Sequence, residues 1–148
     1  MADVMSAEKR SSLMSRIKGK DTRPEMLVRQ GLWRAGLRYR LHDRRLPGRP
    51  DLVLPRWHAV VLVHGCFWHQ HPGCPHAAVP ATRAESWQQK LSGNRERDAR
   101  AHGALLASGW RVAVVWECAL RQDAERSIRT LEQWVRSSGQ TIEIGRQP

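Results

Sequence analysis

The stretch PDLVLPRWHAVVLVH, residues 50–64, decides how this chain folds. Residues 51–54 and 58–63 are short apolar runs rich in branched side chains, which predicts two strands, the second of them buried. A Pro-Arg pair separates the two runs. If the strands are neighbours, the start of the first meets the end of the second. Asp51 and His64 would then lie close together, with an exposed backbone carbonyl beside them.

Helical patterns flank this pair of strands. Thr22–Glu25 has the sequence of a capping box, and Gly36 is a typical helix stop, so a helix is predicted between them. A second capping box at Thr82–Glu85 predicts a helix to about Leu91, and Asn94 is predicted to cap a further helix that ends at Gly109. The other predicted elements are an edge strand at 37–41, a buried strand at 110–116 and a helix at 123–137. This order predicts an α/β fold with a mixed sheet and helices on both faces.

Charge indicates the kind of partner. The chain has 148 residues, the length of one domain, with 25 Lys and Arg against 14 Asp and Glu, a net charge of +11. So basic a chain attracts polyanions, because neutralising phosphates releases counterions. Binding to a membrane surface is a weaker alternative, since no long basic helix has a wholly apolar opposite face. Residues 1–20 are polar and basic and fit either a short helix or an arm that orders on DNA.

The location of the protein is predicted from what the sequence lacks. It has no apolar run near the roughly 20 residues that cross a bilayer. Its first residues have neither the basic start nor the apolar stretch of a signal peptide. We therefore expect a cytoplasmic protein, associated with the nucleoid when it binds DNA.

The three cysteines point to a metal site. Cys66 and Cys74 flank His71, and Cys118 follows the predicted strand at 110–116. Three thiolates and one imidazole form a common structural zinc set, and sulfur ligands favour zinc over magnesium or calcium. The other histidines within reach of the two loop cysteines are His69 and His76. The alternative is that the cysteines are ordinary buried side chains.

A second group of residues suggests hydrolysis. The Asp51 carboxylate with a carbonyl and water suits Mg²⁺, and His64 or His69 could relay protons near neutral pH. From spacing alone, a hydrolytic site is no better supported than the alternative, in which Asp51 caps a turn and His64 is a polar residue at the end of a strand. Asp98 fits a solvated helix face, and Glu25 fits the capping box itself.

The aromatic residues fall into two groups. The tryptophans in apolar periodic patterns, predicted to lie in the core, are Trp33, Trp110, Trp116 and Trp134. Trp68 and Trp87 lie instead among polar and basic residues. In that setting, stacking on nucleic-acid bases is an alternative role for these two residues.

Several motifs follow one another along the chain. They are LPGRPD at 46–51, HGCFWH at 64–69, PATR at 80–83, NRERD at 94–98 and VWECALR at 115–121. Together they resemble the very short patch repair endonucleases, in that family's order and over about residues 10–121 of the chain. HGCFWH together with VWECAL is the most specific part of the match.

The resemblance implies a fold akin to restriction endonucleases of the PD-(D/E)XK class. It implies an enzyme that nicks DNA 5′ to the T of a T:G mismatch, which arises when 5-methylcytosine deaminates, and so starts short-patch repair. Mg²⁺ would be the catalytic cofactor and Zn²⁺ a structural one. The implied partners are mismatched double-stranded DNA and mismatch-repair and DNA polymerase factors, and the enzyme would act as a monomer.

The resemblance also assigns the site residues. Asp51 would bind Mg²⁺ with the carbonyl of Val63, and Asp98 would orient His69 or its bound water. The other implied active-site residues are His64 and Glu25. The implied zinc ligands are Cys66, His71, Cys74 and Cys118.

The aromatic residues take a specific role from the same resemblance. Phe67, Trp68 and Trp87 would form a wedge inserted beside the mismatch, where a mispaired step costs less to unstack. Met14 would enter from the other groove. The alternative is that Phe67 and Trp68 cap the hydrophobic core beside the zinc.

Two competing functions remain at this point. One is a nuclease of the same fold with a restriction or toxin role. The other is a zinc-stabilised DNA-binding protein without catalysis. In the favoured organisation, residues 1–20 contact DNA and residues 21–148 form the endonuclease domain of a single-domain protein.

Overall fold

The computed structural model describes residues 21–148, and its centre is a sheet of five strands in the order β1-β2-β3-β4-β5. The strands are β1 (Arg40–Leu41), β2 (Leu52–Leu54), β3 (Ala59–His64), β4 (Arg111–Trp116) and β5 (Thr141–Ile144). β1, β2 and β3 pair antiparallel, whereas β3, β4 and β5 pair parallel. The predicted mixed α/β sheet is therefore confirmed.

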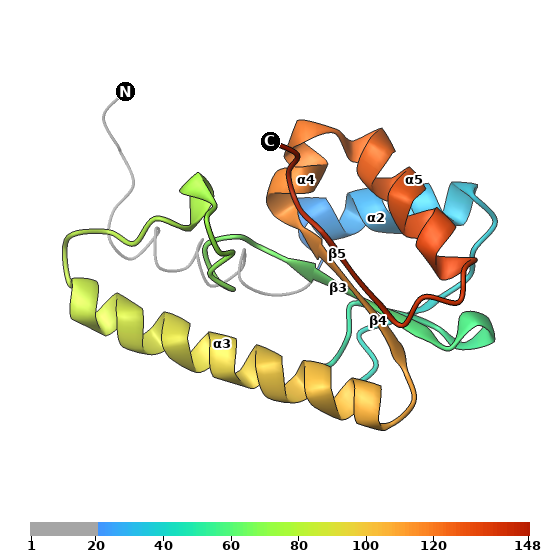
Figure 1. The fold of residues 1–148 in the computed structure, drawn as a ribbon, viewed down its shortest axis with the longest axis horizontal. Helices are drawn as coiled ribbons and strands as arrows, with labels where there is room; N and C mark the ends of the chain where they lie inside the picture. The colour runs from blue at the N-terminus through green and yellow to red at the C-terminus, as the bar shows by residue number, and fades with distance from the viewer. Residues whose placement is uncertain (1–20) are drawn as a thin grey trace.

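Helices cover both faces of this sheet. They are α2 (Arg23–Arg34), α3 (Ala84–Ala107), α4 (Glu117–Gln122) and α5 (Ala124–Val135). Figure 1 shows α3 along one face and α2, α4 and α5 grouped on the other. Side chains alternate along a strand, so Val61 packs in the buried cluster with α2 and α5, and Val60 in the one with Leu105 of α3.

Local signals place the ends of two helices. The Thr22 hydroxyl accepts a hydrogen bond from the Glu25 amide at 3.4 Å, and Gly36 after α2 has φ +87°. Asp123 caps α5 by accepting from the Arg126 amide at 3.0 Å. These caps satisfy backbone groups that a helix end leaves without partners, which is why the predictions for α2 and α5 are confirmed.

The prediction of two helices across residues 82–109 was wrong. α3 is one helix of 24 residues, and Arg83 precedes it with φ +56° and no side-chain cap. Asn94 does not cap a helix, because its amide donates to the Trp68 carbonyl at 3.0 Å and accepts from Arg97. A tertiary contact thus uses the side chain that would otherwise have started a new helix.

The structure differs from the predictions at smaller points too. α4 and β5 were not predicted, and the edge strand spans only Arg40–Leu41. Trp33 is not a core residue: it is 52% exposed, with the Arg38 guanidinium 3.6 Å from its ring centroid. Trp110 is only partly buried, stacked on His58, whereas Trp116 and Trp134 are buried as predicted. Within residues 21–148 no helix is long and apolar enough to cross a membrane.

Candidate active site and metal cluster

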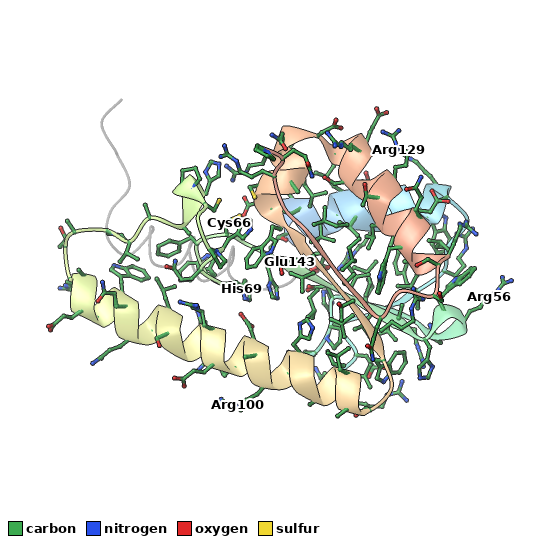
Figure 2. The ribbon with its side chains drawn as sticks, viewed as in Figure 1. Arg56, Cys66, His69, Arg100, Arg129 and Glu143 are labelled. Carbon is green, nitrogen blue, oxygen red and sulfur yellow. The ribbon has the colours of Figure 1, made fainter. Side chains whose placement is uncertain are left out.

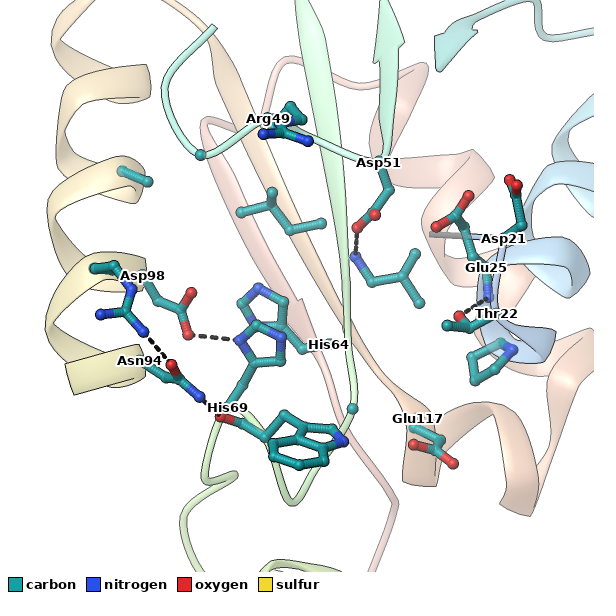
Figure 3. A pocket seen from close by; sticks show the side chains of 18 of the residues that line it. Asp21, Thr22, Glu25, Arg49, Asp51, His64, His69, Asn94, Asp98 and Glu117 are labelled. Atoms are coloured by element: carbon teal, nitrogen blue, oxygen red, sulfur yellow. Dashed lines mark hydrogen bonds and ion pairs between the residues drawn. The ribbon is translucent and has the colours of Figure 1, made fainter. Parts of the chain in front are cut away.

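A cavity of about 810 Å³ opens where β2 begins and β3 ends. Its walls come from the start of α2, the loop before β2, the end of β3, the middle of α3 and the first residue of α4. Figure 3 shows carboxylates and imidazoles from these elements around one space. The predicted meeting of the two strand ends therefore creates a pocket rich in ionisable groups.

Asp51 lies at the centre of one wall. Its Oδ2 accepts a hydrogen bond from the Val63 amide at 2.7 Å, which joins the start of β2 to the end of β3. The pKa of Asp51 is raised to about 7, chiefly by burial and also by the nearby Glu25 carboxylate, against the lowering effect of the hydrogen bond from the Val63 amide. Two facing carboxylates repel each other when both are ionised, and a cation between them removes that repulsion. Such a pair is a donor set suited to a hard divalent cation.

Glu25 is held in place by two basic side chains. It is only 2% exposed, and its Oε2 accepts from Arg29 and contacts His42 Nε2 at 2.8 Å. Arg29 also pairs with Asp21 at 2.5 Å, and the His42 amide donates to the Asp51 carbonyl at 3.2 Å. Neither Arg29 nor His42 was predicted as a residue of the site. The spacing of Glu25 and Arg29, four residues apart on one helix, could have indicated the first; nothing in the sequence indicated the second.

The opposite wall carries a stacked pair of histidines. His64 and His69 lie with ring centroids 3.8 Å apart and planes 5° apart. His69 Nδ1 lies 2.6 Å from Asp98 Oδ2, so the carboxylate on α3 fixes the orientation of that ring. Burial lowers the pKa of His64 to about 3, and its Nδ1 has no hydrogen-bond partner in the described part of the chain. His64 is therefore a neutral ring that supports His69.

The cysteines gather beside this cavity. Donor atoms of Cys66, His71, Cys74 and Cys118 lie within 4.8 Å of one another. His71 Nδ1 is 3.7 Å from the Cys66 sulfur and 3.4 Å from the Cys118 sulfur. Tetrahedral zinc separates such atoms by about 3.5 Å, given zinc–ligand bonds of about 2.3 and 2.0 Å. The donor set can hold a metal ion, and the histidine in it is His71.

Burial shifts the pKa values of two residues of the cluster. The pKa of the Cys66 thiol is raised to about 12, chiefly by burial and also by the neighbouring thiols, so without a cation this side chain keeps its proton. Burial lowers the pKa of His71, which favours the neutral ring that a metal needs. The His71 ring stacks on Trp116 with centroids 4.1 Å apart, which fixes its orientation.

The three aromatic residues of the suggested wedge form one cluster next to the cavity. The Phe67 ring lies 5.0 Å from Trp68 and 5.4 Å from Trp87, and Lys90 is 5.7 Å from the Trp68 ring. All three rings are partly buried, and none belongs to the two buried cores of the described chain. Met14, the other residue of the suggested wedge, lies outside the described residues.

Comparisons with known proteins show the family of this chain. Residues 2–75 match the family model for the DNA mismatch endonuclease Vsr. The chain is 50% identical over 120 residues to the type II nicking enzyme V.XorIIP of Xanthomonas oryzae, which covers 81% of this chain and 88% of that protein. It is 42% identical over 151 residues to the DNA mismatch endonuclease Vsr of Escherichia coli, which covers 99% of this chain and 96% of that one. The chain therefore belongs to the Vsr family of DNA mismatch endonucleases.

Proposed function

We propose that this enzyme nicks DNA on the 5′ side of the T in a T:G mismatch that arises from deamination of 5-methylcytosine, in a reaction that needs Mg²⁺. One observation carries the proposal. Asp51, bonded to the Val63 amide, shares a cavity with the paired His69 and Asp98. Family membership supports the choice of a mismatch as the substrate.

The carboxylates form the metal-binding side of the proposed site. Asp51, with the backbone carbonyl of Val63, would hold Mg²⁺, whose charge would stabilise the negative phosphodiester in the transition state. Glu25 supports this wall, since Arg29 and His42 fix its carboxylate beside Asp51. Ionised Asp51 is the form that binds a cation, so binding would oppose the rise that burial causes in its pKa.

The histidines form the proton-transfer side. Asp98 accepts the Nδ1 proton of His69, which leaves Nε2 of that ring able to take a proton from an attacking water. His64 stays neutral and stacks on His69, so it restricts the ring to one plane. Roles of this kind need an oriented imidazole more than a strongly basic one.

The aromatic cluster would provide selectivity. Phe67, Trp68 and Trp87 would insert beside the mismatch, with Met14 from the other groove. A T:G step costs less to unstack than a matched step, so a wedge would favour binding there. The alternative of an aromatic cap on the core is less well supported, because these rings stand outside both buried clusters of the described residues.

A structural metal site and a DNA-binding segment complete the proposed enzyme. Zn²⁺ would be the structural ion at Cys66, His71, Cys74 and Cys118, with no part in the reaction. Residues 1–20 would contact DNA, and residues 21–148 would form the endonuclease domain. We propose that the enzyme is a cytoplasmic monomer that associates with the nucleoid when it binds DNA. It would act before its partners, the mismatch-repair and DNA polymerase factors.

A nicking assay tests the proposal. Labelled duplexes with one T:G mismatch in a cytosine-methylation context, and matched T:A and C:G duplexes, are incubated with and without added Mg²⁺. We expect one nick 5′ to the T, only in the mismatch and only with Mg²⁺. Asp51→Ala should abolish the nick and leave DNA binding nearly intact, whereas Asp43→Ala, which removes an aspartate paired with Arg45 outside the cavity, should cut normally.

Other results would favour the competing functions. Cutting of matched DNA would indicate a restriction-type nuclease, and tight binding without cutting would indicate a non-catalytic DNA-binding protein. The wedge is tested separately. Trp68→Ala should lower affinity for the mismatched duplex more than for the matched one, whereas Trp33→Ala, at an exposed tryptophan, should change neither. Equal losses on both duplexes would reject the wedge.

A further inference from the structure

The loop that leads into Asp51 has an unusual backbone. Gly48 has φ +71° and Arg49, directly after it, has φ +49°. Glycine adopts this left-handed region freely, but an arginine there costs roughly 1 kcal/mol or more. Such a conformation persists only where the surrounding structure imposes it.

Packing against α3 imposes it here. A Cβ atom on Gly48 would lie 2.6 Å from the Ala101 Cβ, so the loop passes as close to α3 as a glycine allows. The Arg49 amide donates to the Leu46 carbonyl at 3.1 Å, and the next residue, Pro50, is buried. The direction in which Arg49 leaves the backbone is therefore fixed from both sides.

The Arg49 side chain has no polar partner within the described chain. It is exposed and lines the cavity, and within residues 21–148 its guanidinium makes no hydrogen bond or ion pair. Arg97, another cation of the same cavity, donates to Asn94 instead. Figure 3 shows Arg49 on the wall that carries Asp51, on the side toward α3. A strained and rigid loop thus presents an unpaired cation next to the proposed cutting site.

We propose that Arg49 binds the non-bridging oxygens of the phosphate that is cut. This rests on the proposed nicking function and adds a residue to it. Asp51 and Glu25 make their wall of the cavity acidic, which repels a DNA phosphate, and a fixed guanidinium nearby offsets that repulsion. Guanidinium is a cation that also matches phosphate geometry with two parallel donors.

Binding measurements with a neutralised phosphate test this contact without cleavage. T:G duplexes carry either a normal phosphate or a neutral methylphosphonate at the position 5′ to the T, in buffer without added divalent cation. The methylphosphonate should weaken wild-type binding about tenfold, as expected for a charged hydrogen bond. Arg49→Gln should lose about tenfold on the normal duplex and nothing further on the neutral one.

The control is Arg56→Gln. Figure 2 places Arg56 at the end of the molecule away from His69 and Cys66, and that residue is absent from the cavity wall. The Arg56→Gln variant should lose affinity on the methylphosphonate duplex as much as the wild type does. Arg49→Gly accepts the left-handed backbone without strain, so the same loss of response in this variant would show that misfolding is not the cause.

The decisive contrary result is simple. If Arg49→Gln and Arg49→Gly still lose about tenfold on the neutral duplex, the guanidinium does not contact that phosphate. Nicking by the wild type on the same normal duplex, with Mg²⁺ added, reports separately on the proposed function. A wild type that does not nick the mismatch, yet responds through Arg49, would overturn the function and keep the phosphate contact.

Discussion

Burial acts in opposite directions on the ionisable side chains of the cavity. It raises the pKa of Asp51 to about 7, since a buried carboxyl resists charging, and it lowers the pKa of His64 to about 3 for the same reason. Groups whose environments separate their pKa values in this way commonly mark a catalytic site. In this chain the two residues lie at the same end of one antiparallel strand pair, where β2 begins and β3 ends, so a single fold feature produces both effects.

The pKa of His64 predicts a dependence of stability on pH. Because its folded value lies below the ordinary 6.5, His64 contributes stability above pH 6.5 that is lost as the pH falls toward 3. For each unit that the pH falls in this range, the free energy of unfolding of the wild type should drop by up to about 1.4 kcal/mol more than that of His64→Gln. Urea unfolding at a series of pH values measures this, and an NMR signal of the His64 ring that titrates near pH 6.5 would contradict it.

The support around Glu25 predicts a second effect. Arg29→Met leaves a buried carboxylate with less compensation, and should lower the free energy of unfolding by about 2–3 kcal/mol. Arg34→Met is the control, since Arg34 is exposed in the last turn of the same helix and should change stability little. Adding Glu25→Gln to Arg29→Met should recover part of the loss. Equal losses in the two arginine variants, measured by urea unfolding, would mean that the pairing with Glu25 contributes nothing.

At the scale of elements, close packing between helices decides more than helix propensity does. Gly31 of α2 faces α5, where a Cβ would lie 2.5 Å from the Ile128 Cγ2. At Gly103 of α3, by contrast, a Cβ would have nothing within 4 Å. Both lie inside helices, where alanine is intrinsically preferred over glycine by roughly 1 kcal/mol.

These two glycines should therefore respond oppositely to alanine. Gly103→Ala should raise the free energy of unfolding by about 0.5–1 kcal/mol, the propensity gain alone. Gly31→Ala should lower it by about 1–2 kcal/mol, because α2 and α5 must separate or Ile128 must change rotamer. Thermal and urea unfolding of the two variants provide the test, and stabilisation by Gly31→Ala would show that the contact between the helices is loose.

At the scale of the whole molecule, the cysteine cluster joins distant parts of the chain. His71 and Cys118 are 47 residues apart in sequence, and their contact ties the long loop after β3 to the start of α4. The same loop carries Phe67, Trp68 and His69, so the cluster positions the proposed wedge and one histidine of the proposed active site. A bound metal would stabilise this arrangement, because the unfolded chain does not bring the ligands together.

Metal removal tests this connection. Purified protein should contain about one zinc per chain, and a chelator should lower the midpoint of thermal unfolding and weaken mismatch binding together. His71→Gln should lose the metal, whereas His76→Gln, at an exposed histidine outside the cluster, should retain it. Retention of zinc by His71→Gln, measured by metal analysis, would contradict the assigned ligand set.

Local signals in the sequence determined much of the fold. The capping box at Thr22, the stop at Gly36, the helical pattern from Asp123 and the apolar run before His64 placed two helices and the central strand near their observed bounds. These features depend on hydrogen bonds and periodicity within a few residues, so they can be read without knowing the fold. The meeting of Asp51 with the end of β3 followed from the same strands.

Only the tertiary structure decided which distant side chains meet. His69 and Asp98 are 29 residues apart and His42 and Glu25 are 17 apart, and no periodic pattern links either pair. The same applies to Asn94, whose side chain bonds to the loop at Trp68 and so leaves α3 continuous. Such contacts depend on how helices and loops pack on the sheet. The sequence by itself thus determined the elements and the kinds of residue at the site, and packing determined how those residues are paired.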